Sequence, residues 1–195
     1  MLARLRKFLL GVAYPLTGFI GKVHMPYSHK QITSKQYREI KKILLPGMAM
    51  CTQTRGEMTN IFIPGFWSHA AIYVGDSKVM EAVSKGVVVT DLIDFLLTKD
   101  AVIVKDPIFA DRDQMIDAVT WALSQEGKGY DFYFDKSNDF FYCAEFLWLA
   151  YERTIGEMPF TKIDTMWGLP TVVPEDIVDA HKKWATRYDS RYDSK

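Results

Sequence analysis

Two distant segments of the chain constrain its fold and its chemistry more than any other feature. Residues 68–75 have the composition of a β-strand that begins with His69, and residues 142–145 open a helix that begins with Cys143. A helix N-terminus favours a thiolate through its partial positive charge, and a neutral imidazole can accept the thiol proton. A fold that brings these two side chains together has the parts of a thiol nucleophile, so we interpret the chain as a cysteine hydrolase.

Length and charge narrow the class of protein. The chain has 195 residues, which is long enough for one substantial core and short for two domains. Its 24 basic residues balance 24 acidic ones, and no cluster of lysines and arginines stands out, so nucleic acid is not an expected partner. The two cysteines, Cys51 and Cys143, are too few for a disulfide framework, and we expect both to be free thiols.

The first 33 residues are expected to form an extension of the domain. Basic residues at positions 4, 6 and 7 precede an apolar run that resembles the start of a signal peptide. No cleavage site follows, Pro15 interrupts the run, and the run is too short to span a bilayer as a helix. Three interpretations stay open: an atypical signal, an anchor that gives peripheral membrane contact, or a segment packed on the core. A cytoplasmic or membrane-associated location is favoured, and export is an alternative.

Residues 34–184 are expected to form a single catalytic domain, and residues 185–195 a polar, frayed tail. Apolar periodicity and turn residues predict helices over 34–45, from about 91 to 99, over 111–125 and over 140–155. Strands are predicted over 48–54, 69–75, 78–83, 86–89 and 101–105. The strands on either side of Gly75-Asp76-Ser77 should form a β-hairpin at the centre of the sheet.

The hairpin decides whether Glu81 can act with His69. A loop with an odd number of residues, such as Gly75-Asp76-Ser77, places Glu81 opposite Ala71 and on the face that carries His69, whereas a two-residue loop sends Glu81 to the other face. With the odd loop, the carboxylate can accept a proton from one imidazole nitrogen and leave the other nitrogen for the thiol. We therefore expect Cys143 as the nucleophile, His69 as the general base and Glu81 as the group that orients the imidazole.

Each of these residues also has a purely structural interpretation. A cysteine within an apolar helix is more often packed in the core than catalytic, and a glutamate on a strand is usually solvated. Glu145 is expected only to sit in the first turn of its helix and to favour the helix dipole. It is the combination of cysteine, histidine and glutamate that favours catalysis.

A family resemblance supports this interpretation. The order of Ser68-His69, Met80-Glu81-Ala82, the aromatic segment 128–134 and Tyr142-Cys143-Ala144-Glu145 resembles the YiiX-like group of NlpC-type papain-fold cysteine peptidases, whose core is circularly permuted. The resemblance covers about residues 46–179. It implies an α+β fold of the papain-like, permuted NlpC type, with a central antiparallel sheet packed against helices and the nucleophile at a helix N-terminus.

The resemblance also implies roles for particular residues. Cys143, His69 and Glu81 match the family's catalytic positions, and Tyr130, Asp131 and Tyr142 are implied to lie at the substrate cleft, where the alternative is a loop that packs aromatic rings on the core. The chain departs from the family pattern at Met48, where an aspartate is usual, and at Ala144, where a serine is frequent. Residues 174–177, Pro-Glu-Asp-Ile, resemble the family's C-terminal Pro-x-Asp segment, which closes the domain.

The expected reaction is acyl transfer through a thioester on the cysteine. The resemblance favours the amide bond of a peptide or a cell-wall peptide as the substrate. The first alternative is a lipid-directed thioesterase or acyltransferase like lecithin retinol acyltransferase, with an acyl lipid as substrate, and the second is a non-catalytic binding module on the same fold. No cofactor is expected, and because the sequence has no His-Glu-x-x-His, paired Cys-x-x-Cys or Gly-rich phosphate loop, no metal is expected either.

Overall fold

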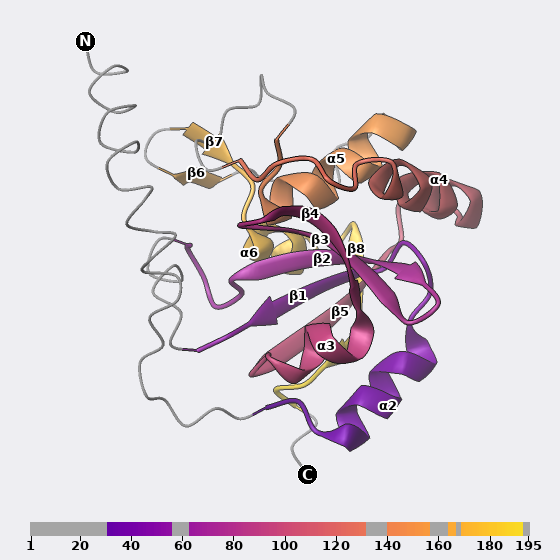
Figure 1. Ribbon diagram of the computed structural model, residues 1–195, viewed down its shortest axis with the longest axis vertical. Coiled ribbons are helices and arrows are strands. Elements are labelled where there is room, and N and C mark those ends of the chain that lie inside the picture. Colours follow the sequence, from indigo (N-terminus) through magenta and orange to yellow (C-terminus); the bar gives the residue numbers. More distant parts are fainter. Residues whose placement is uncertain (1–30, 56–62, 132–139, 157–163, 167–168, 193–195) are drawn as a thin grey trace.

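A six-stranded antiparallel sheet with strand order β4-β3-β2-β1-β5-β8 forms the centre of the protein (Figure 1). The computed structural model describes residues 31–55, 63–131, 140–156, 164–166 and 169–192. The strands are β1 (Ala49–Gln53), β2 (His69–Gly75), β3 (Lys78–Val83), β4 (Gly86–Asp91), β5 (Ala101–Pro107) and β8 (Trp184–Asp189). A separate hairpin pairs β6 (Asp164–Met166) with β7 (Leu169–Thr171).

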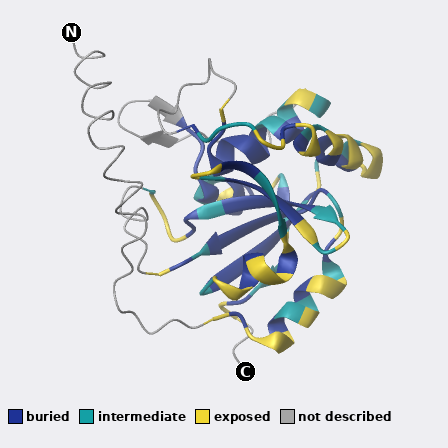
Figure 2. Ribbon diagram, viewed as in Figure 1, coloured by how far each residue is buried: buried dark blue, intermediate teal, exposed yellow. Residues whose placement is uncertain are grey.

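Helices cover both faces of this sheet (Figure 1). The helices are α2 (Ser34–Ile43), α3 (Leu92–Leu97), α4 (Arg112–Leu123), α5 (Cys143–Ile155) and α6 (Pro174–Asp179). Alternate residues of the central strands enter two separate apolar clusters. In β2, Ala70 and Ile72 pack with α4, α5 and α6, whereas Ala71 and Tyr73 pack with α2 and α3. The central strands are therefore buried on both sides, as Figure 2 shows, because a strand presents successive side chains to opposite faces.

The fold class expected from the sequence is confirmed, since the protein has an antiparallel sheet packed against helices. The predicted helices are present with shorter ends. α2 begins at a capping box in which Thr33 and Gln36 bond each other's backbone N–H groups, and it ends shortly before Pro46, a proline that disfavours helical backbone at the residue directly before it. α5 begins at Cys143 itself, with Tyr142 extended at the N-cap.

The C-terminal part differs from the sequence expectation. Residues 184–189, most of which were expected to belong to a frayed tail, form β8, which pairs with β5 at the edge of the sheet. Only Trp184 of this strand is fully buried, and Arg187 forms an ion pair with Asp106 on the neighbouring strand. An edge strand carries polar and charged residues, so it lacks the apolar alternation that marks a strand in sequence. The expectation of a frayed end at residues 185–189 was wrong for this reason.

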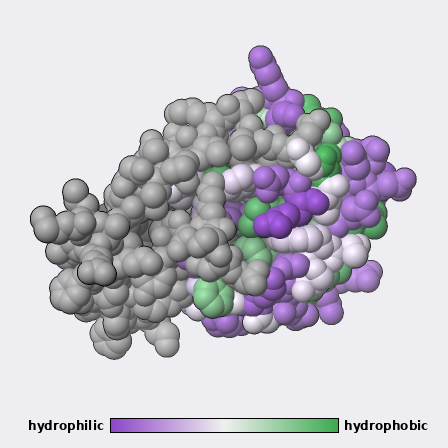
Figure 3. Space-filling model, turned by 90° about the horizontal axis from the view of Figure 1, so that it is seen from above, coloured by the Kyte–Doolittle hydropathy of each residue, from purple (hydrophilic) through white to green (hydrophobic). Residues whose placement is uncertain are grey.

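The expectations for the N-terminal extension concern residues 1–33, of which residues 1–30 lie outside the described part of the chain. In the described part, none of the helices combines the length and apolar character that crossing a membrane requires. Seen from above, the described surface is mostly hydrophilic, with small and separate hydrophobic patches (Figure 3).

Candidate active site

The β2–β3 hairpin places Glu81 on the face that carries His69. Glu81 lies opposite Ala71, which is the predicted register. The turn that produces it is not a plain three-residue loop, however. Gly75 pairs with Lys78 across a two-residue turn of Asp76 and Ser77, both with positive φ, and a β-bulge between Tyr73 and Gly75 adds one residue to β2. The bulge restores the parity that the two-residue turn alone would have reversed.

Glu81 is bonded at both carboxylate oxygens. Its Oε2 lies 2.7 Å from Nε2 of His69, and its Oε1 accepts a hydrogen bond of 2.6 Å from the hydroxyl of Thr90 on β4. Only 16% of the His69 side chain and 9% of the Glu81 side chain are exposed. Burial would raise the pKa of Glu81, but His69, Thr90 and the charge of Lys99 outweigh it and lower the pKa to about 2. Glu81 is therefore a carboxylate near neutral pH.

Cys143 occupies the first position of α5 and is 6% exposed. Burial opposes ionisation of its thiol. The hydrogen bond to His69 and the charge of that imidazole act in the other direction, as do the backbone N–H groups of Ala70 and Ala144, and together they lower the pKa of Cys143. Because Nε2 of His69 is engaged by Glu81, Nδ1 is the nitrogen left to face the sulfur.

His69 shows the matching change. Burial would lower its pKa, but the hydrogen bonds to Cys143 and Glu81 and the charges of both groups raise the pKa to about 9. A cysteine with a lowered pKa beside a histidine with a raised pKa favours a thiolate–imidazolium pair near neutral pH. The three residues expected to be catalytic thus lie together, in an arrangement that can supply a nucleophile and a proton donor.

Cys51 has a different environment. It lies fully buried in β1, its Sγ donates to the carbonyl oxygen of Pro174 at 3.7 Å, and burial raises its pKa. Both cysteines are free. Only Cys143 has the helix N-terminus and the imidazole that activate a thiol.

The three residues implied to lie at the substrate cleft occupy one corner of the fold. Residues 129–131 run beside Phe141, to which Tyr130 forms an isolated bridge and Asp131 donates a backbone hydrogen bond. Tyr130 is half-buried, and burial followed by the charge of Cys143 raises its pKa, so it lies near the thiol. Asp131 is 1% exposed and Tyr142 is 4% exposed. The rest of the aromatic segment, residues 132–134, lies outside the described residues.

Two residues beside the site were not predicted. Thr90 holds Glu81, and the only sequence signal for this role is its place in β4, where it pairs with Val79, two residues before Glu81. Glu175 holds the segment that precedes His69. Glu145, expected at the helix start, is there and is buried.

Comparisons with a family model and with solved structures agree with this geometry. A family described as "Permuted papain-like amidase enzyme, YaeF/YiiX, C92 family" matches residues 43–186. The crystal structure of the metalloprotein yiiX from Escherichia coli O157:H7 superposes with a TM-score of 0.60 at 21% identity, over 73% of this chain and 96% of that one, and this likeness shows the fold. No curated protein matches the chain. Within the described residues, no three His, Cys, Asp or Glu side chains are grouped so that they could hold a metal ion.

Proposed function

This chain belongs to the YaeF/YiiX, C92 family of permuted papain-like amidases, and from that premise we propose that it hydrolyses an amide bond of a peptide or cell-wall peptide through a thioester on Cys143. The observation that carries the proposal is the chain of contacts from Cys143 through His69 and Glu81 to Thr90. In it, a thiol of lowered pKa stands at a helix N-terminus beside a buried imidazole of raised pKa.

Each residue has a defined part in the proposed reaction. The Cys143 thiolate attacks the amide carbonyl, and the backbone N–H groups at the start of α5 stabilise the oxyanion that forms. The His69 imidazolium gives its proton to the leaving amine, which departs and leaves a thioester on Cys143. Neutral His69 then takes a proton from water, the hydroxide attacks the thioester, and the acid and the free thiol are released. Glu81 keeps Nε2 occupied throughout, so that Nδ1 faces the reacting atoms.

The three cleft residues support substrate binding in different ways. Tyr130 is the one with exposed surface near Cys143, so we propose it as the residue that a substrate touches. Asp131 and Tyr142 are buried, and we propose that they shape the wall of the cleft.

The test compares wild type with Cys143→Ala, His69→Ala, Glu81→Gln and the control Cys51→Ala. The substrates are peptide amides, cell-wall stem peptides and acyl thioesters of long-chain fatty acids. We expect wild type and Cys51→Ala to hydrolyse amides and to show a covalent acyl adduct on Cys143 by intact mass. Cys143→Ala should show neither, His69→Ala should lose nearly as much, and Glu81→Gln should lose less, because a neutral amide still holds the ring.

The same panel contains the outcomes that would contradict the proposal. Adducts formed only from the fatty acyl thioesters would favour a lipid-directed acyltransferase or thioesterase. Tight binding of a stem peptide with no turnover in wild type or in Cys143→Ala would favour a binding module. Iodoacetamide at mildly acidic pH should mark Cys143 before Cys51, and equal labelling of the two cysteines would contradict the assignment of the nucleophile.

A further inference from the structure

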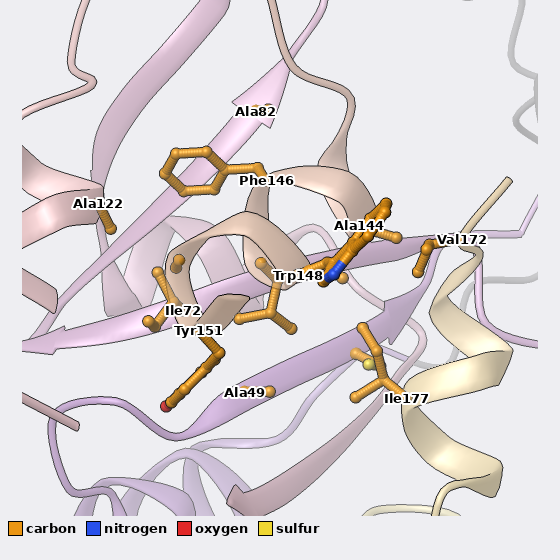
Figure 4. Close-up of a cluster of buried hydrophobic side chains, with 14 of the residues drawn as sticks. Ala49, Ile72, Ala82, Ala122, Ala144, Phe146, Trp148, Tyr151, Val172 and Ile177 are labelled. Carbon is orange, nitrogen blue, oxygen red and sulfur yellow. The ribbon is translucent and has the colours of Figure 1, made fainter. Parts of the chain in front are cut away.

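A short segment near the C-terminus contacts two parts of the site, the start of α5 and the residues that precede His69. Residues 172–175, which run from the end of β7 into the first two residues of α6 and are named the clamp segment below, reach the start of α5 through Val172. The N–H of Val172 donates to the hydroxyl of Tyr142 at 3.1 Å, and Tyr142 directly precedes Cys143. Both residues are buried, and Figure 4 shows Val172 beside Ala144. This end of the clamp segment therefore fixes the helix start that carries the thiol.

The other end of the clamp segment fixes the approach to His69. Oε2 of Glu175 accepts hydrogen bonds from the N–H of Phe66 at 2.7 Å and from the N–H of Trp67 at 3.1 Å. The next N–H, that of Ser68, donates to the carbonyl oxygen of Thr52 at 3.0 Å. The three peptide N–H groups before His69 are thus all held, two of them by one carboxylate.

The chain around Phe66 and Trp67 is shaped to accept that carboxylate. Gly65 has a φ of +94°, which favours glycine, and a Cβ at this position would collide with the carboxylate of Glu175. The guanidinium of Arg191 lies over the rings of Phe66 and Trp67, 5.4 and 4.9 Å from their centroids. Arg191 is itself held by Asp189 at the end of β8.

The clamp segment is also anchored between its two ends. The carbonyl oxygen of Pro174 accepts a hydrogen bond from the Cys51 thiol, which connects the segment to β1 in the middle of the sheet. The N–H of Val173 donates to the carboxylate of Asp176 at 2.9 Å, which closes the first turn of α6. The clamp segment is therefore packed and held along its length. Because close-packed protein interiors are hard to compress and transmit strain, a shift at one end of such a segment moves the other end.

We propose that the clamp segment sets the position of Cys143 relative to His69, and that Glu175 is a positioning residue which acts through the backbone of residues 66 and 67. The inference rests on the proposed function, because it concerns the same two catalytic side chains. Tyr142, which receives the other end of the clamp segment, is its second contact point. A displacement of about 1 Å in such a pair costs on the order of 100-fold in rate, so two backbone hydrogen bonds are enough to matter.

The test measures alkylation of Cys143 by iodoacetamide near pH 6, a reaction that needs no substrate. Glu175→Ala removes both backbone hydrogen bonds, and we expect its rate to fall by about 10-fold or more. Glu175→Gln keeps an oxygen that can accept both N–H groups and should stay within about twofold of wild type. Asp179→Ala, an exposed position at the end of α6, is the matched control and should also stay within about twofold. All rates are compared at a temperature at which each variant is folded.

A merely structural role for Glu175 gives a different result. In that case Glu175→Ala would lower the thermal midpoint and leave the alkylation rate of the folded protein unchanged, and this outcome would overturn the inference. Should Glu175→Ala fail to fold, Tyr142→Phe provides the test, since it removes the acceptor of the Val172 N–H and keeps the ring. A lower alkylation rate in Tyr142→Phe supports the positioning role of the clamp segment. An unchanged alkylation rate, with a raised KM for the substrate, overturns it.

The clamp and the proposed function can fail separately. If wild type hydrolyses no amide but Glu175→Ala slows the alkylation of Cys143, the positioning role of the clamp segment is supported and the proposed hydrolase function is contradicted. If wild type hydrolyses amides but Cys143 is alkylated equally fast in wild type and Glu175→Ala, the proposed hydrolase function is supported and the positioning role of the clamp segment is contradicted.

Discussion

The imidazole of His69 has two partners, Cys143 and Glu81, and both raise its pKa. Both the Cys143 thiolate and the Glu81 carboxylate stabilise its charged form, and together they raise its pKa to about 9 despite burial. A group whose pKa is raised on folding stabilises the folded state fully below its ordinary pKa of 6.5, and this contribution is lost as the pH rises through about 9. Glu81 has the opposite sign, because its pKa falls from 4.5 to about 2, so its contribution is present above 4.5 and is lost as the pH falls toward 2.

Titration of His69 by NMR tests this account of the residue. In wild type, we expect the His69 ring to titrate near pH 9. In Cys143→Ala the ring loses the hydrogen bond and the charge that do most to raise its pKa, so its midpoint should move toward lower pH. A His69 midpoint that is equal in the two proteins would show that the thiol and the imidazole do not interact.

The closeness of the three candidate catalytic residues was largely predictable, because local signals mark two of them: Cys143 stands where an apolar helix begins and His69 where a strand begins. Glu81 lies opposite Ala71 as predicted, but the expected odd-residue loop was wrong, and the register comes from a two-residue turn together with a bulge. The structural roles of Thr90 and Glu175 were not predictable in this way. Thr90 reaches Glu81 only through the register of the β3–β4 pair, and Glu175 reaches residues 66 and 67 across more than 100 positions of sequence.

At the scale of the element, the β2–β3 hairpin shows how a bulge can replace a loop residue. The turn residues Asp76 and Ser77 have φ values of 48° and 58°, in the left-handed region. Such φ values are costly for most residues, and a two-residue hairpin turn that needs them at both positions favours Asn-Gly or Asp-Gly. The sequence Asp76-Ser77 therefore has the favoured first residue and a less favoured second one.

Ser77→Gly tests this description of the turn. The substitution removes the steric cost of the positive φ at this position and keeps the backbone N–H that donates to the hydroxyl of Tyr73. We expect the free energy of unfolding to rise by about 0.5–1 kcal/mol, as measured by urea denaturation. Gly75→Ala, at a φ of 102°, is the opposite variant and should lower it. A lower free energy of unfolding in Ser77→Gly would mean that the turn residues do not adopt these angles.

The sequence predicted most elements and misplaced the ends of several. Periodicity and capping residues located α2 and α4, since Thr33 with Gln36 and Asp111 with Gln114 both form capping boxes. The bulge in β2 was not predictable, because nothing in the residues Tyr73 to Gly75 distinguishes an added residue in the strand from one in the loop. β8 was missed because its hydrogen bonds to β5 are made by the backbone, while its side chains are polar.

At the scale of the whole molecule, the last elements of the chain hold the first ones together. Lys105 of β5 is fully buried and donates from Nζ to the carbonyl oxygen of Val178 in α6 and to the hydroxyl of Thr186 in β8. Trp184 packs edge to face on Phe109 and Tyr151, so β8 also contacts α5. α6 and β8 therefore complete a core that the preceding elements leave open.

Two truncations decide whether the C-terminal strand is part of the folded domain or a tail. Ending the chain after Lys183 removes β8 together with Trp184, and loss of a buried tryptophan side chain alone costs about 3–5 kcal/mol. Domains are typically stable by about 5–15 kcal/mol, so we expect this protein to be unfolded or insoluble.

Ending the chain after Ser190 is the matched control. It keeps β8 and both hydrogen bonds between Ser190 and the backbone of Val102, and it removes only the residues beyond, including Arg191 and the largely exposed Tyr192. Loss of the cation–π contacts of Arg191 to Phe66 and Trp67 should cost about 1 kcal/mol, because the guanidinium is partly exposed. Thermal and urea unfolding of the two truncated proteins measure the difference. Equal stability of both would mean that β8 contributes nothing, and that the C-terminal residues are the frayed tail that their composition suggests.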